Sequence, residues 1–250
     1  MDNQINPFSL AGKTILVTGA SSGIGRAVAV QCALMGAKVV LNGRNGHALG
    51  TTKDAMGGEG HSCITGDLTI EADRMSLAEM VPQLDGVVNC AGIGQRKLCK
   101  SITENDISEV MSINFNAAAL LQSALLSARK INKNASIVFI SSRTADVPTI
   151  ANSIYSASKG ALKSYAKCLA VELAPKGIRV NCISPAMVWT DLIMGDGTTL
   201  EQLKEAEQKY PLKRYGQPVE IANLAVYLLS DAASWMTGSC IDITGGAVEL

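Results

Sequence analysis

A tyrosine and a lysine four residues apart are the pair in this sequence whose types and spacing most directly suggest chemistry. Tyr155 and Lys159 stand one helical turn apart, so on a helix their side chains share a face. A unit charge roughly 4 Å from the phenol, at an effective dielectric of about 20, is worth around 4 kcal/mol, or near three pKa units. Lys159 would therefore lower the pKa of Tyr155 from about 10 towards working pH. Such a phenol can act as general acid on a carbonyl and as general base in reverse.

A serine at the end of an apolar run supplies a third polar group. Ser142 follows the segment SIVFIS at residues 136–141, which predicts a strand, so its hydroxyl would lie at the mouth of that strand. The hydroxyl could hold a carbonyl oxygen beside the phenol of Tyr155. For the Tyr155 and Lys159 pair alone, the alternative is a packed aromatic residue beside a solvated helix charge.

An asparagine falls on an apolar helical stripe and is the fourth candidate. Asn114 shares helical spacing with the apolar residues Ile107, Met111, Ala118, Leu121 and Leu125. A polar group on a buried face is destabilising unless it is hydrogen-bonded. The Asn114 amide could hold a water molecule or open the helix backbone, and a satisfied core asparagine is the alternative.

A glycine-rich turn predicts a dinucleotide site. The sequence TGASSGIG at residues 18–25 follows a strand-like run and precedes a helical pattern that starts at Arg26. Glycines let the backbone turn sharply and approach a pyrophosphate, whose charge is met by the helix N-terminus. We expect cofactor contacts from Gly19, Ser21, Ser22, Gly23, Ile24 and Gly25.

An arginine after the second predicted strand indicates which dinucleotide binds. Arg44 stands in the sequence LNGRN, and no acidic residue lies between Lys38 and Asn45. An arginine here meets the 2′-phosphate of NADP, whereas an acid would accept the ribose hydroxyls of NAD. NADP is therefore expected and NAD is less favoured, with a solvated surface arginine as the alternative. In the segment GDL, Asp67 with Leu68 could contact adenine, or Asp67 could cap a local turn.

Short apolar runs alternate with helical patterns along the whole chain. The alternation predicts a doubly wound α/β fold, a single Rossmann domain (1–250) with a seven-stranded parallel sheet. Ligands of such sheets bind beyond the carboxyl ends of the strands, where the residues above fall. The expected strands are 14–17, 38–41, 63–64, 86–89, 137–140, 179–183 and 240–243, and the expected helices lie near 23–35, 46–56, 71–80, 104–130, 153–174 and 218–230.

Two further segments lie at strand ends. The fourth strand ends in NCAG, where Asn89, Ala91 and Gly92 would let the chain pass close beneath a cofactor, with a structural turn as the alternative. The longest irregular stretch begins at residue 184, and we expect a substrate loop over about 184–210, because loops of this length are often lids or binding loops. At its start, Pro185 and Val188 are expected to contact the cofactor.

Composition limits the class of protein. The chain has 250 residues, 47% of them hydrophobic, and a net charge of zero, so one domain can bury a continuous core and a nucleic-acid partner has little electrostatic support. Seven cysteines without CxxC spacing are typical of a reduced, cytosolic protein, and no metal site is expected. The start MDNQINPFSL lacks the pattern of a signal peptide, and no run of about 18 apolar residues occurs. We expect a cytoplasmic protein without a membrane partner.

With these motifs in this order, the chain resembles the classical short-chain dehydrogenase/reductase (SDR) family over nearly its whole length. The resemblance implies a catalytic tetrad. Asn114 would position a relay water, Ser142 would orient the substrate carbonyl, Tyr155 would transfer the proton, and Lys159 would bind the nicotinamide ribose and lower the tyrosine pKa. It also implies that Thr190, in the segment PAMVWTD, contacts the cofactor.

The resemblance also implies an assembly and includes two departures. A homotetramer would form through the helices near 104–130 and 153–174, where the small residues 117–119, Ala157 and Ala161 permit close packing. The family usually has asparagine and glycine where this chain has Cys90 and Ala186. Both replacements are small, so we expect them to be tolerated.

Within the family, residues 211–246 look like the C-terminal portion of 3-oxoacyl-[acyl-carrier-protein] reductases, a signal that sugar, polyol and steroid dehydrogenases share. The leading expectation is reduction of a 3-oxoacyl thioester, free or on an acyl-carrier protein. A sugar or polyol dehydrogenase is the alternative enzyme, and a non-catalytic dinucleotide-binding sensor is the alternative from another class. The intact set of Asn114, Ser142, Tyr155 and Lys159 argues against the sensor.

Two surfaces bear on the substrate. The loop after the sixth strand carries Met187, Trp189, Leu192, Ile193 and Met194, with only Asp191 and Asp196 to bind hydroxyls, which favours an apolar substrate that Trp189 touches. Arg129, Lys130 and Lys133 form a basic cluster near a helix C-terminus. An acidic carrier protein could dock there, and favourable charge at a helix C-terminus is the alternative.

Overall fold

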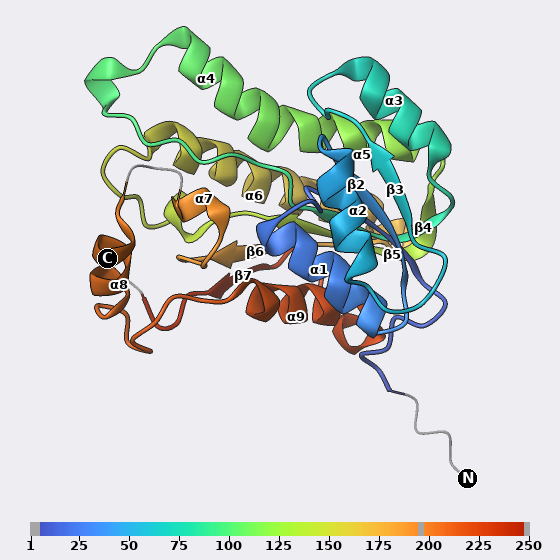
Figure 1. The fold of residues 1–250 in the computed structure, drawn as a ribbon. Coiled ribbons are helices and arrows are strands. Elements are labelled where there is room, and N and C mark those ends of the chain that lie inside the picture. Colours follow the sequence, from blue (N-terminus) through green and yellow to red (C-terminus); the bar gives the residue numbers. More distant parts are fainter. Residues whose placement is uncertain (1–5, 195–197, 248–250) are drawn as a thin grey trace.

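A fully parallel seven-stranded sheet forms the centre of the molecule (Figure 1). The computed structural model describes residues 6–194 and 198–247. The strand order is β3-β2-β1-β4-β5-β6-β7, so the winding reverses between β1 and β4, and the predicted doubly wound fold is confirmed. The strands are β1 (Thr14–Thr18), β2 (Lys38–Gly43), β3 (Ser62–Thr65), β4 (Leu84–Asn89), β5 (Ile131–Ile140), β6 (Arg179–Pro185) and β7 (Cys240–Ile243).

Helices cover both faces of the sheet (Figure 1). One face is covered by α1 (Gly23–Leu34), α2 (Gly46–Asp54) and α9 (Pro218–Leu229). The other face is covered by α3 (Glu71–Met80), α5 (Ala117–Ser127) and α6 (Ser153–Leu173), with α4 (Glu104–Met111) packed on α6. Two shorter helices, α7 (Asp191–Met194) and α8 (Leu200–Glu207), follow β6.

The strands are apolar on both faces because each face packs against helices. In β1, Ile15 and Val17 belong to the core beneath α1 and α9, whereas Leu16 belongs to the core beneath α5 and α6. All three side chains are fully buried. This two-sided burial explains why the strands appear in the sequence as continuous apolar runs without alternation.

The helix expected near 104–130 contains a wide turn. Residues Ser112–Asn116 form a π-helical turn between α4 and α5, and such turns occur frequently at functional sites. Within the described chain, Glu104–Ser127 is the segment long and apolar enough to cross a membrane by composition. An 18-residue stretch of it has a mean hydropathy of 1.3, which is more apolar than the sequence led us to expect. Leu121 and Leu125 of this segment pack against the sheet, as in a core helix.

The stretch expected to be an irregular substrate loop contains helices. In α8, Thr199 and Gln202 form a capping box, in which the hydroxyl accepts from Gln202 N at 3.2 Å and the amide oxygen accepts from Thr199 N at 2.9 Å. The T-x-x-Q pattern is a helix-start signal that the sequence analysis missed. Residues 195–197, including Asp196, lie outside the described residues.

Candidate active site

Ser142, Tyr155 and Lys159 lie together where β5 ends and α6 begins. The Ser142 hydroxyl hydrogen-bonds to the Tyr155 phenol, and Lys159 Nζ lies 5.8 Å from the centre of the Tyr155 ring. Lys159 Nζ donates to the Ile140 carbonyl at 3.0 Å, and the Ser141 hydroxyl donates to the Lys159 carbonyl at 2.9 Å. These two bonds fix helix α6 to the end of strand β5, so the three candidate side chains have a rigid support.

Burial controls the ionisation of this pair. It raises the pKa of Tyr155, although the hydrogen bond from Ser142 acts in the opposite direction. Burial also lowers the pKa of Lys159 to about 8, opposed by the nearby thiols of Cys90 and Cys182. The expectation that Lys159 depresses the pKa of Tyr155 is therefore wrong in this structure, because desolvation dominates and the ammonium is directed at a carbonyl. A protonated phenol at neutral pH is the form needed by a general acid.

Asn114 lies in the π-helical turn and is completely buried. Its Oδ1 accepts from Ile93 N at 2.8 Å, and its Nδ2 donates to the Ile93 carbonyl at 3.0 Å and to Ser158 Oγ at 3.1 Å. The amide therefore joins the chain after β4 to helix α6. The sequence analysis missed Ser158, whose signal was a small polar residue one turn from Tyr155 on the buried side of the helix.

Gly92 passes between Asn114 and Lys159. A Cβ atom at this position would lie 3.1 Å from Asn114 Oδ1 and 3.3 Å from Lys159 Nζ. Both contacts are tighter than ordinary van der Waals packing, so a larger residue would displace one of the two groups. The structure thus brings Gly92 into direct proximity to two of the predicted tetrad residues.

The glycine-rich turn crosses the end of β4 with no room for side chains. Gly19 has a φ of +64°, and a Cβ there would lie 2.9 Å from the Ala91 backbone. A Cβ on Gly25 would lie 2.2 Å from the Gly19 carbonyl oxygen. Helix α1 starts beyond Ser22 without a side-chain cap, so its first N–H groups suit an anionic ligand. These features fit the diphosphate of a dinucleotide cofactor.

Thr18 connects the two strands at this crossing. Its hydroxyl accepts from Cys90 N at 3.1 Å and from Ala91 N at 3.3 Å. Asn89, the last residue of β4, accepts from the Gln122 amide at 3.0 Å and leaves its own buried Nδ2 without a hydrogen-bond partner. The sequence analysis named the motif that starts at Thr18 but gave this residue no role.

Arg44 and Asp67 lie side by side at the carboxyl ends of β2 and β3. Arg44 Nη1 lies 3.9 Å from Asp67 Oδ2, and the arginine side chain is 68% exposed. Asp67 Oδ1 accepts hydrogen bonds from Thr69 N at 2.9 Å and from Thr69 Oγ1 at 2.8 Å. These two bonds lower the pKa of Asp67 more than the charge of Arg44 does. Asp67 therefore caps a local turn as well as facing Arg44, and Leu68 beside it is buried.

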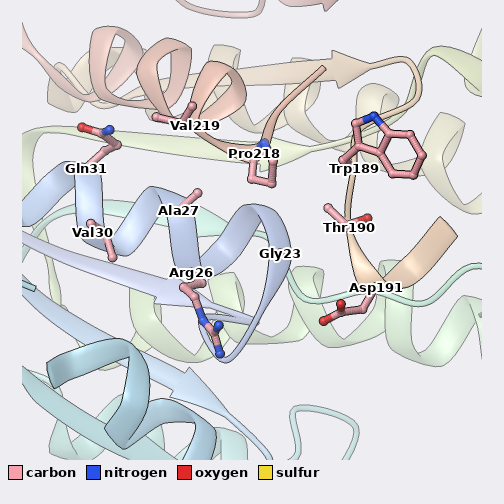
Figure 2. A pocket seen from close by; sticks show the side chains of 10 residues that line it. All are labelled: Gly23, Arg26, Ala27, Val30, Gln31, Trp189, Thr190, Asp191, Pro218 and Val219. Carbon is pink, nitrogen blue, oxygen red and sulfur yellow. The ribbon is translucent and has the colours of Figure 1, made fainter. Parts of the chain in front are cut away.

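Thr190 lies beside the glycine-rich turn of residues 18–25. Thr190 and Gly23 line a cleft of about 430 Å³. Figure 2 shows Thr190 and Asp191 opposite Gly23 and Arg26 at the start of α1. A Cβ on Gly23 would lie 3.3 Å from the Thr190 methyl group. Val188 has a buried side chain and forms a bridge with Gly216, and Pro185 ends β6, so both hold the backbone that carries Thr190.

Trp189 packs on α8. Its indole N–H donates to Glu207 Oε2 at 3.0 Å, and its ring lies 5.4 Å from that of Tyr215. The expectation that Trp189 touches substrate therefore has little support, because the ring is engaged within its own loop. Exposed apolar side chains occur instead on the loops after β4 and before α6 and on helix α7, at Leu98, Ile150, Leu192 and Met194.

The basic cluster lies at the amino end of β5, opposite to the end that carries Ser142. Arg129 and Lys130 directly precede β5, and Lys133 is its third residue. Ser142 follows the other end of the strand. Lys130 Nζ donates to the carbonyls of Glu79 and Val81 at 2.9 and 2.7 Å. These contacts favour the helix-terminus alternative over a carrier-protein site that serves Tyr155 of the same chain.

The burial of Lys159 predicts how stability changes with pH. Since its pKa is about 8 in the folded protein and 10.5 ordinarily, the unfolded chain binds more protons between these values, and stability rises with pH there. Relative to Lys159→Met, the free energy of unfolding of the unmutated protein should increase by about 3 kcal/mol from pH 8 to pH 10.5. Urea unfolding at several pH values measures this difference. A difference that stays flat would contradict the desolvation of Lys159.

Comparisons with known proteins agree with this geometry. A family model described as Enoyl-(Acyl carrier protein) reductase matches residues 19–248. The chain is 34% identical to versicolorin reductase stcU of Emericella nidulans, with 96% of this chain and 97% of that protein covered. It is 32% identical to 3-oxoacyl-[acyl-carrier-protein] reductase FabG of Rickettsia felis, with 97% and 100% covered.

A solved structure shows the same fold with a nucleotide. A protein from Beutenbergia cavernae, described as an NAD(P)-dependent gluconate 5-dehydrogenase with NADP bound at low occupancy, is 32% identical. It matches with a TM-score of 0.86 over 96% of this chain and 98% of that one. The similar proteins thus share one architecture, and their names give different substrates.

Proposed function

The chain belongs to the short-chain dehydrogenase/reductase family and is an NAD(P)-dependent oxidoreductase of CH–OH and carbonyl groups, and from this premise we propose that it reduces a 3-oxoacyl thioester with NADPH. The observation that carries the proposal is the partly buried Tyr155, hydrogen-bonded to Ser142 and beside Lys159, together with exposed apolar side chains on the loops after β4 and before α6. We also propose that the reaction takes place in the cytoplasm, since all seven cysteines are free thiols, as is usual in a reducing compartment.

In the proposed mechanism, Ser142 and Tyr155 hold the substrate carbonyl oxygen. The nicotinamide cofactor supplies the hydride when bound. Tyr155 gives its phenolic proton to the oxygen as negative charge develops there, and its burial keeps the proton in place until then. Lys159 is held by the Ile140 carbonyl beside the Tyr155 ring and would bind the nicotinamide ribose, while Asn114 fixes the chain after β4 against α6.

The residues around the glycine-rich turn would hold the cofactor. Gly19, Gly23 and Gly25 leave the start of α1 open to a diphosphate, and Arg44 would meet the 2′-phosphate of NADPH. The unpartnered Asn89 Nδ2 lies at the end of β4 beneath the same turn and offers a buried donor. The exposed guanidinium of Arg44 supports NADPH over NADH.

The proposed substrate follows from the apolar residues near the site. Leu192 lies against Gly94, 3.5 Å from where a Cβ would stand, and the Lys97 N–H donates to the Ala151 carbonyl at 2.7 Å. The loop after β4, the loop before α6 and helix α7 are thus close together, and each has an exposed apolar side chain, in Leu98, Ile150 and Leu192. Such residues suit an acyl chain better than a polyhydroxylated sugar, which needs partners for each buried hydroxyl.

A chain-length series tests this function. Each methylene buried contributes about 0.8 kcal/mol, so kcat/KM for 3-oxoacyl thioesters should rise by up to about fourfold per methylene from four to eight carbons. NADPH consumption measures the rate. Leu192→Ser should flatten the series, whereas Leu34→Ser, the same change at another exposed leucine at the far end of α1, should leave it unchanged.

The two alternatives give different results in the same assay. If ketohexoses or ketogluconates react faster than every thioester, the chain is a sugar or polyol dehydrogenase, with the Tyr155 mechanism retained. A protein that binds NADPH but turns over none of these carbonyls is better explained as a sensor. The same assay compares kcat/KM for a thioester carried on an acyl-carrier protein with kcat/KM for the free thioester.

We also propose a homotetramer built on the layer of α4, α5 and α6. The outer surface of this layer has exposed apolar residues, including Ile107, Leu120 and Val171, of which Val171 is 78% exposed. Of the small residues expected there, Ala157 is exposed, but Ala117 and Ala118 are buried in the core of their own chain and cannot form an interface.

Light scattering tests the assembly. At micromolar concentration the mass should be about four times the chain mass of 26.2 kDa, and Leu120→Arg should lower it, because a charge at a packed interface is destabilising. Leu34→Arg is the matched control outside this layer. A single mass of one chain in the unmutated protein would contradict the tetramer.

A further inference from the structure

Strands β6 and β7 place two cysteines side by side. Cys182 and Cys240 are directly paired in the register of this parallel strand pair. Both side chains pack into the core cluster beneath α6, which lies over this side of the sheet (Figure 1). Neighbouring strands lie about 4.8 Å apart, which falls within the roughly 4.4–6.8 Å range of Cα separations found in disulfides. The backbone positions of this pair are therefore compatible with a disulfide.

The two thiols differ in accessibility. Cys182 is completely buried, whereas Cys240 is half-buried on β7, the last strand of the sheet. A hydrogen bond from Cys182, together with the charges of Lys163 and Lys167, lowers the pKa of Cys240 against the opposing effects of burial and Asp146. The same hydrogen bond and burial raise the pKa of Cys182. Cys240 is thus the nucleophilic thiolate, and Cys182 is the protonated partner beside it.

We propose that Cys182 and Cys240 form a peroxide-sensitive dithiol that closes to an intrachain disulfide between β6 and β7. The Cys240 thiolate attacks one oxygen of hydrogen peroxide, the O–O bond breaks, and a sulfenic acid forms while hydroxide leaves and takes up a proton from solvent to become water. The Cys182 sulfur then attacks the sulfenic sulfur, the S–S bond forms, and the hydroxyl group leaves with the Cys182 proton as a second water. The two thiols lose two electrons, and the two peroxide oxygens gain them.

The disulfide would act on the candidate active site through Asp242. Asp242 lies two residues after Cys240, on the same face of β7, and accepts from Arg143 Nη1 at 2.9 Å. Arg143 directly follows Ser142. Joining the two sulfurs would draw the two Cβ atoms from about the strand spacing of 4.8 Å towards about 3.8 Å, the mean Cβ–Cβ distance in disulfides. Strand β7 would move, because it pairs with β6 alone in the described sheet.

This movement would displace the loop that carries Ser142. A misplacement of about 1 Å can reduce a rate by as much as a hundredfold, and we expect oxidation to lower turnover about tenfold. The effect on turnover rests on the proposed function, whereas formation of the disulfide does not. Because the bond would be strained, dithiothreitol should reverse it readily.

Peptide mapping of the full-length protein tests the site. After treatment with hydrogen peroxide and blocking with N-ethylmaleimide, non-reducing mass spectrometry should find the Cys182 and Cys240 peptides joined within one chain, and dithiothreitol should separate them. Cys240→Ser should abolish the linked peptide. Cys168→Ser, which removes an exposed cysteine of α6, should leave it in place. Peroxide treatment that oxidises Cys240 without joining it to Cys182, or that links two chains through Cys240, would overturn the proposal.

Turnover of the mapped samples tests the coupling. The oxidised protein should reduce carbonyls about tenfold more slowly than the reduced protein, and Cys240→Ser should show no such loss. A mapped disulfide with unchanged turnover would overturn the link through Asp242. Absence of carbonyl turnover in both redox states would count against the proposed function instead, and the mapping result would stand by itself.

Discussion

Tyr155→Phe is expected to reduce turnover at least about a hundredfold while NADPH affinity stays within about twofold, because the change removes the proton donor and keeps the ring. The ring of Tyr155 is partly buried in the site, and phenylalanine fits the same space. Its hydroxyl is the group that hydrogen-bonds to Ser142, and the loss should therefore fall on kcat. Steady-state rates and fluorescence titration with NADPH measure the two quantities.

A second tyrosine provides the control for this substitution. Tyr165 also lies on α6, and its hydroxyl makes a long bond of 3.4 Å to the Ala119 carbonyl, so Tyr165→Phe should change turnover by less than about twofold. If Tyr155→Phe retains turnover within tenfold of the unmutated protein, another group supplies the proton, and the mechanism proposed here is wrong.

Arg44→Asp is expected to reverse the cofactor preference. A charge-assisted bond from guanidinium to phosphate contributes about 1.5–3 kcal/mol, so its loss should weaken NADPH binding by roughly ten- to a hundredfold. The new carboxylate would also lie near Asp67, which already faces position 44 at 3.9 Å, and the two negative charges would repel the 2′-phosphate. The same carboxylate could accept the ribose hydroxyls of NADH.

Dissociation constants for NADPH and NADH, measured for both proteins, check this reversal. Lys53→Asp makes the same change in net charge on the exposed side of α2 and should alter the NADPH to NADH ratio by less than about twofold. Equal affinity of the unmutated protein for the two cofactors would show that Arg44 does not read the 2′-phosphate.

Local features of the sequence were sufficient to predict the fold. The apolar runs located the seven strands because most of the strands are buried on both faces, although β5 begins at Ile131, six residues before the expected start. The helical patterns located the major helices, because periodicity reports which face of a helix is buried. The glycine-rich turn was equally predictable, since Gly19 and Gly25 stand where a Cβ would collide with backbone atoms. The Tyr155 to Lys159 spacing placed both residues on one face of a helix, as α6 has them.

Helix α8 was a missed local signal, and Trp189 shows where local information ends. The capping box of Thr199 and Gln202 was present in the sequence. In contrast, the contacts of Trp189 with Glu207 and Tyr215 depend on how the loop folds back on itself, which no spacing reveals. The loop appeared to offer its aromatic ring to substrate only because these partners are distant in the chain.

The tertiary structure decided the ionisation of the candidate site and the pairing of the cysteines. The sequence placed a lysine one turn from Tyr155 but could not give the burial that raises the phenol pKa and lowers that of Lys159 to about 8. Cys182 and Cys240 are scattered in the sequence and become neighbours because β6 and β7 pair in one register. Spacing along the chain thus determined which elements form and which residues lie at their ends. Desolvation and contacts between distant segments were decided only by how those elements pack, because both depend on neighbours that the local sequence does not specify.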